Sequence, residues 1–124
     1  MLKPGLSYTS EIIVTDVMSA KHLGSGDMEV LATPALLALM ENAAMLGVAP
    51  YLPNGCTTVG GYISSSHLRP SKIGDCVKAT AVVTNVDGKK IDFKIAAHCG
   101  DTLLGEGTHV RFVVNRNDFL ERLK

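Results

Sequence analysis

This 124-residue chain lacks the features of a nucleic-acid-binding or membrane protein. Twelve Lys and Arg residues balance twelve Asp and Glu residues, without a run of like charge, so charge favours neither nucleic acid nor an anionic membrane as a partner. No segment approaches the roughly 20 consecutive apolar residues that a membrane-spanning helix needs. Residues 1–11 also lack the apolar region of a secretory signal. We therefore expect a cytoplasmic protein that binds neither nucleic acid nor membranes.

Cysteine and histidine are also too sparse for a disulfide framework or a metal centre. The three cysteines are odd in number and have no CxxC spacing, which predicts free thiols in a reducing compartment. They are Cys56, Cys76 and Cys99. None has an activating group nearby in the sequence, so small buried side chains are a better interpretation than nucleophiles. His22, His98 and His109 are too scattered to indicate metal ligands, and we predict no metal site.

The length predicts a single domain over residues 1–124, large enough to bury roughly two thirds of its unfolded surface. Residues 77–83 and 91–97 each alternate apolar and polar side chains, and Asp87-Gly88 supplies a turn between them, which predicts a β-hairpin. Further strands are expected at 11–16, 56–68 and 103–114 and a short helix from Asn117, whereas 19–29 is expected to be a loop.

A helix is expected over residues 34–47. Thr33 can cap free N–H groups, Pro34 is suited to the first helical position, and Gly47 followed by Pro50 supplies the end. The resulting order is strand, helix and then four strands. An apolar helix and an antiparallel sheet with one apolar face indicate an α+β fold in which the sheet wraps around the helix.

Glu41 is the most informative residue, because it lies inside this apolar helix. Its neighbours three and four residues away are Leu37, Ala38, Ala44 and Met45, so the helix offers it no cationic partner. An unpaired carboxylate in apolar surroundings is costly, which favours a functional role or a partner from another element. The alternative is a side chain that points to solvent or caps a backbone group.

Three parts of the chain carry a resemblance: Thr33 with Glu41 and His67, residues 67–75, and residues 105–111. Together they resemble the fluoroacetyl-CoA thioesterase family, whose fold is the hotdog fold. Ala32-Thr33, Glu41 eight residues after that Thr, and His67 a further 26 residues on are similar to the Thr, Glu and His set of that family. The segment 67–75 resembles the strand end with Pro and Gly-Asp of hotdog thioesterases, and 105–111 resembles the Gly-Thr-His segment of the last strand. The resemblance covers essentially the whole chain.

The resemblance implies an acyl-CoA thioesterase that needs no cofactor, since coenzyme A is part of the substrate. It implies that Thr33, Glu41 and His67 form one catalytic site, that Gly60 offers a backbone N–H to the oxyanion, and that the chain forms a homodimer. The chemistry is consistent, because a carboxylate can attack a thioester or activate water, and a histidine can manage the proton. Whether Glu41 is the nucleophile or the base stays open.

Each of these residues also has a structural interpretation. Thr33 can be a helix cap alone, His67 an ordinary surface histidine, and Gly60-Gly61 a bulge in a strand. Eight helical residues span about 12 Å, so a capping Thr33 could not touch Glu41 directly.

The acyl group and the reaction also have alternatives. Residues 18–31 contain no aromatic side chain, whereas the corresponding segment of the fluoroacetyl-CoA enzyme is longer and aromatic. The sequence therefore does not specify fluoroacetyl-CoA among small acyl-CoA substrates. A hotdog enoyl-CoA hydratase or dehydratase and a non-catalytic acyl-CoA-binding module are the competing interpretations.

Overall fold

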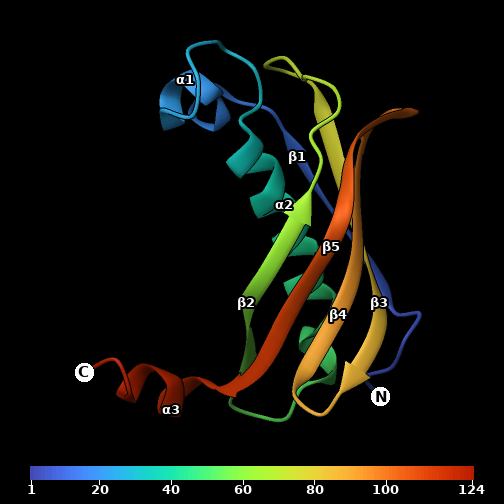
Figure 1. Cartoon of the computed structure of the whole chain (residues 1–124), viewed down its shortest axis with the longest axis vertical. Helices are drawn as coiled ribbons and strands as arrows, with labels where there is room; N and C mark the ends of the chain where they lie inside the picture. Colours follow the sequence, from blue (N-terminus) through green and yellow to red (C-terminus); the bar gives the residue numbers. More distant parts are fainter.

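The computed structural model describes all 124 residues and contains a five-stranded antiparallel sheet that curves around one long helix (Figure 1). In spatial order the strands are β1, β3, β4, β5 and β2, so β1 and β2 form the two edges. Their bounds are Ser7–Ile13 for β1, Cys56–Ser65 for β2, Cys76–Asp87 for β3, Lys90–Cys99 for β4 and Thr102–Asn115 for β5. The long helix, α2, spans Thr33–Val48. The expected α+β architecture with the order strand, helix and four strands is confirmed.

The central hairpin forms where the alternation predicts it. Residues of β3 and β4 that face α2 are buried, whereas those between them are partly or fully exposed. The buried set is Val77, Ala79, Ala81, Val83, Ile91, Phe93, Ile95 and Ala97. Gly88 has a φ of +60° in the turn, a conformation that glycine adopts without strain. The apolar faces of sheet and helix therefore build the core together.

Thr33 is the first residue of helix α2 and not the cap that precedes it. The residue before the helix is Ala32, which makes no side-chain capping bond, and Thr33 is itself helical. The expectation that Thr33 caps the helix is wrong, because its hydroxyl instead contacts His67. After Val48 the chain continues into a short 3-10 turn, Ala49–Tyr51, which contains Pro50. Six α2 residues are fully buried, consistent with a helix enclosed on most sides.

The N-terminal strand lies earlier than expected. Strand β1 covers Ser7–Ile13 rather than 11–16, because its backbone pairs with β3 along residues that are polar or exposed. Residues 19–29, expected to be a loop, contain the short helix α1, Ala20–Leu23, which follows a 3-10 turn at Asp16–Met18. Near the C-terminus, α3 spans Arg116–Glu121, and the Asn115 side chain accepts a hydrogen bond from the Asp118 N–H. No helix combines the length and apolar character needed to cross a membrane.

Strand β2 has an irregular backbone near its centre. Its pairing with β5 shifts between Gly60 and Tyr62, so the bulge that was the structural alternative for Gly60-Gly61 is present. A Cβ on Gly61 would overlap the Phe112 ring, and a Cβ on Gly107 would overlap the Ser64 carbonyl oxygen. The two strands can therefore approach closely only because side chains are missing at these positions.

We predict that Gly107→Ala destabilises the protein by at least about 1–3 kcal/mol, because the new methyl group must push β2 away from β5. The change should appear as a lower urea midpoint. The control is Thr108→Ala on the exposed side of the same strand, which should cost much less. Equal midpoints for Gly107→Ala and the wild type would contradict the close approach of the strands.

Candidate functional site

The Glu41 carboxylate lies against the glycine pair of β2. Oε2 of Glu41 is 3.0 Å from the position that a Cβ would take on Gly60. Both border a cavity of about 300 Å³. Its lining residues are Glu41, Gly60, Gly61, Tyr62, Ile63 and His109. The Glu41 side chain keeps 40% of its surface exposed, so this carboxylate is held by the protein and is still accessible to a small molecule.

The cationic partner that α2 cannot supply comes from β5. Nη1 of Arg111 is 3.9 Å from Oε2 of Glu41, and the arginine side chain is only 8% exposed. Arg111 donates from Nε to the Thr58 hydroxyl and from Nη2 to the Thr58 carbonyl oxygen. Burial lowers the pKa of Arg111, and the Glu41 charge acts in the opposite direction.

His109 lies beside this arginine. It is 1% exposed, and its ring stacks on Phe93 with the ring centroids 5.8 Å apart. Nδ1 of His109 is 2.7 Å from the Tyr62 carbonyl oxygen, and Nε2 is 3.3 Å from Nη1 of Arg111. Burial is the main cause that lowers the pKa of His109 below its ordinary value. The Tyr62 carbonyl and Glu41 act against this shift, and the Arg111 charge reinforces it.

Sequence reasoning did not identify Arg111 as part of the site. The pattern that could have identified Arg111 is the alternation of side chains along β5, since residues two apart share one face of a strand. His109 pairs with Phe93 and Arg111 pairs with Ile91, and both partners are buried against α2. A histidine and an arginine on an otherwise apolar face would have indicated a buried polar group opposite Glu41.

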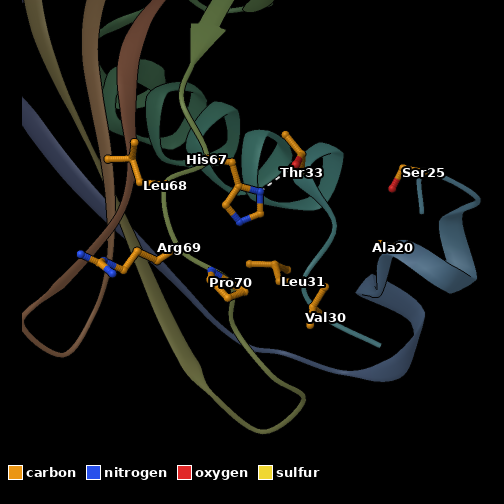
Figure 2. A pocket seen from close by; sticks show the side chains of 9 residues that line it. All are labelled: Ala20, Ser25, Val30, Leu31, Thr33, His67, Leu68, Arg69 and Pro70. Atoms are coloured by element: carbon orange, nitrogen blue, oxygen red, sulfur yellow. Dashed lines mark hydrogen bonds between the residues drawn. The ribbon is translucent and has the colours of Figure 1, made fainter. Parts of the chain in front are cut away.

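Thr33 and His67 form a second polar pair at the start of α2. Oγ1 of Thr33 is 2.7 Å from Nδ1 of His67. Figure 2 shows the two side chains pointing toward each other, one from α2 and the other from the segment after β2. They border a cavity of about 360 Å³ that also includes Ser25 near α1 and Arg69 and Pro70 after the histidine. The predicted association of Thr33 with His67 therefore occurs within one chain.

The other ring nitrogen of His67 has a different environment. Nε2 is buried and makes no hydrogen bond to the protein. A buried polar atom without a partner is costly, so functional groups of a ligand or of another chain would be favoured there. His67 is thus held by Thr33 through one ring nitrogen, while the other is buried without a protein partner.

The two polar groups are separate within one chain. The cavity at Glu41 and the cavity at His67 share no lining residue. The eight residues from Thr33 to Glu41 correspond to about 12 Å along the helix. The structure therefore brings Glu41 to Gly60 and Thr33 to His67, but it does not bring all four residues to one point. No group of three His, Cys, Asp or Glu side chains comes together in a way that could hold a metal ion.

Comparison with known proteins gives one consistent result. Residues 14–117 match the family model described as fluoroacetyl-CoA-specific thioesterase. The fluoroacetyl-CoA thioesterase of Streptantibioticus cattleyicolor is 29% identical over 129 residues, which cover 99% of this chain and 93% of that protein.

Solved structures agree with the family match. A variant of the fluoroacetyl-CoA thioesterase in complex with acetyl-CoA has a TM-score of 0.93 at 28% identity, covering 98% of this chain and 96% of its own. A thioesterase superfamily member from Thermus thermophilus has a TM-score of 0.88 at 23% identity, covering 98% of this chain and 92% of its own, which supports the fold alone. The chain belongs to the fluoroacetyl-CoA-specific thioesterase family, a family of thioester hydrolases with the hotdog fold.

Proposed function

We propose that the protein hydrolyses the thioester of a small acyl-CoA, giving the free acid and coenzyme A, with Glu41 at the reacting carbonyl. The observation that carries this proposal is the Glu41 carboxylate, which is paired with Arg111 and opens into the cavity at Gly60. Structural relatives in complex with acetyl-CoA, or with fluoroacetate and CoA, support a small acyl group.

The three cysteines are free thiols, which supports the proposed cytoplasmic location.

Two roles of Glu41 are consistent with this geometry. The carboxylate attacks the thioester carbonyl and forms a mixed anhydride that water then cleaves, or it takes a proton from a water that attacks directly. In either route negative charge develops on the carbonyl oxygen. The side-chain-free backbone at Gly60 allows a close approach of that oxygen, and a backbone N–H there would stabilise it.

His67, oriented by Thr33, would accept and donate the protons that the hydrolysis transfers. If Nδ1 of His67 donates to the Thr33 hydroxyl, Nε2 carries the lone pair that a general base needs. The same nitrogen, once protonated, can donate to the departing thiolate of coenzyme A. The Thr33 hydroxyl can accept from Nδ1 or donate to it, so it orients the ring and is compatible with this tautomer.

A homodimer would bring Glu41 of one subunit close to the Thr33 and His67 pair of the other. Strand β2 is a ten-residue edge strand, and Tyr62 on it is 59% exposed. Long exposed edges favour pairing with another chain, and two identical chains pair through a twofold axis. Antiparallel pairing of two β2 strands would place the partner's His67, which follows the end of its β2, alongside the half of the strand that faces Glu41. We therefore propose that each site takes Glu41 from one subunit and Thr33 and His67 from the other.

The proposed activity is tested by thiol release from acetyl-CoA, fluoroacetyl-CoA and longer acyl-CoAs. We expect release from at least one short acyl-CoA. An absorbance change with an enoyl-CoA in the absence of thiol release would favour a hydratase. Binding without turnover of any acyl-CoA would favour a binding module, and either result would contradict the proposal.

Glu41→Gln should lower kcat by on the order of 100-fold or more, since the amide keeps the shape of the side chain but can neither attack nor accept the proton. Thermal unfolding should change little. The matched control, Glu106→Gln, removes an exposed carboxylate outside the Glu41 cavity and should retain wild-type kcat. Near-normal turnover by Glu41→Gln would remove Glu41 from the mechanism.

Mixing two inactive variants tests the shared site. Subunits of Glu41→Gln and His67→Ala are unfolded and refolded together in equal amounts. If the site is shared, half of the dimers carry one intact site, which restores about one quarter of the wild-type rate. Each variant refolded alone should stay inactive. No restoration in a sample shown by native mass spectrometry to contain mixed dimers would place the whole site within one subunit.

A further inference from the structure

The proposed reaction assigns no role to His109, although it is among the least exposed polar side chains of the chain. The Tyr62 carbonyl oxygen can only accept a hydrogen bond, so Nδ1 of His109 must carry the proton. Arg111 can only donate, so Nε2 of His109 must be the bare nitrogen that accepts from Nη1. The two contacts therefore require the same neutral tautomer of the imidazole.

The guanidinium of Arg111 is fixed from three directions. Thr58 accepts from Nε through its hydroxyl and from Nη2 through its carbonyl oxygen, at 2.8 and 2.9 Å. His109 accepts from Nη1. Because the guanidinium is planar and rigid, these bonds determine its orientation, and Nη1 is the nitrogen that faces Glu41.

We propose that His109 is a positioning residue, which as a neutral imidazole protonated at Nδ1 holds Arg111 so that its charge faces Glu41 and the adjacent cavity. This inference rests on the proposed role of Glu41 in that cavity. Both nitrogens of His109 are already bonded to protein groups, so neither is free for a substrate. The effect of His109 therefore passes through Arg111, and the alternative of His109 as the general base does not fit these contacts.

Protonation of His109 would break the arrangement. A proton on Nε2 would turn this nitrogen from a hydrogen-bond acceptor into a donor that points at the Arg111 cation. The Phe93 ring stacks on the imidazole. The nearby negative charge is that of Glu41, which favours the protonated form. The unfolded chain has an ordinary histidine pKa near 6.5, whereas burial lowers the pKa of His109 in the folded state. Between these two pKa values the unfolded state binds more protons, so stability falls as the pH drops below about 6.5.

Two substitutions separate the two bonds of His109. His109→Asn keeps an N–H near the position of Nδ1 but cannot reach Arg111, whereas His109→Gln places an amide oxygen near Nε2 and loses the donor to Tyr62. We predict that the urea midpoint of the wild type falls more steeply between pH 7 and pH 5 than that of His109→Gln, which has no titrating group at this position. Parallel curves would contradict a neutral, buried His109.

Nitrogen NMR gives a readout that does not depend on activity. At pH 7 we expect His109 to show a protonated Nδ1 and a bare Nε2. The Nη–H groups of Arg111, one of which donates to His109, should exchange slowly in the wild type and in His109→Gln, and faster in His109→Asn. A doubly protonated ring, the opposite tautomer, or equal exchange in all three proteins would overturn the proposal even if the protein proves not to be a thioesterase.

Kinetic measurements on the 124-residue chain test the consequence for the reaction. With a short acyl-CoA, His109→Asn should lower kcat about tenfold or more with KM within about twofold, and His109→Gln should retain most of kcat. In an Arg111→Gln background, His109→Asn should have no further effect, since the residue it positions is already gone.

Equal losses for the Asn and Gln variants, or losses that multiply in the double variant, would show a merely structural role and overturn the proposal. Should His109→Asn not fold, the tautomer of His109 in the wild type and the retained kcat of His109→Gln remain decisive. Absence of thiol release from the wild type would instead contradict the proposed function, while the NMR measurements still decide on His109.

Discussion

A carboxylate on the buried helix needs a positive charge, and in this protein the charge must come from the sheet. Helix α2 offers Glu41 only apolar neighbours, and Arg111 reaches it from β5. That arginine is itself buried, so Thr58 and His109 must satisfy its donors. The single carboxylate of Glu41 is thus accompanied by three polar side chains on an otherwise apolar face of β2 and β5. They are Thr58, His109 and Arg111.

The fold was largely predictable from the sequence because its signals are local. Alternation and a Gly turn define the hairpin of β3 and β4, and an apolar run with Pro34 defines α2. The start of β1 was predicted too late, since an edge strand with exposed residues shows little hydrophobic pattern. Local signals at Thr33 indicate a helix cap, and only the family resemblance linked it to His67, whose ring lies 34 residues further along the chain.

The sequence could nominate candidate site residues but not their arrangement. Glu41 stood out because it contrasts with its own helix, and Gly60 because glycine pairs mark close approaches. Arg111 did not stand out, since an arginine in a strand is normally solvent-exposed, although its position two residues after His109 places both on the same face of β5. Spacing along α2 correctly indicated that Thr33 and Glu41 are too far apart for direct contact.

The glycine pair of β2 also limits how the protein can change. Any side chain at Gly60 meets the Glu41 carboxylate, and any side chain at Gly61 meets the Phe112 ring. One wall of the cavity therefore consists of peptide groups that single substitutions cannot reshape without disturbing the acid or the strand. If this cavity holds the acyl group, as proposed, divergence toward other acyl chains would have to proceed through the opposite walls. The carboxylate could then stay constant while the acyl preference evolves around it.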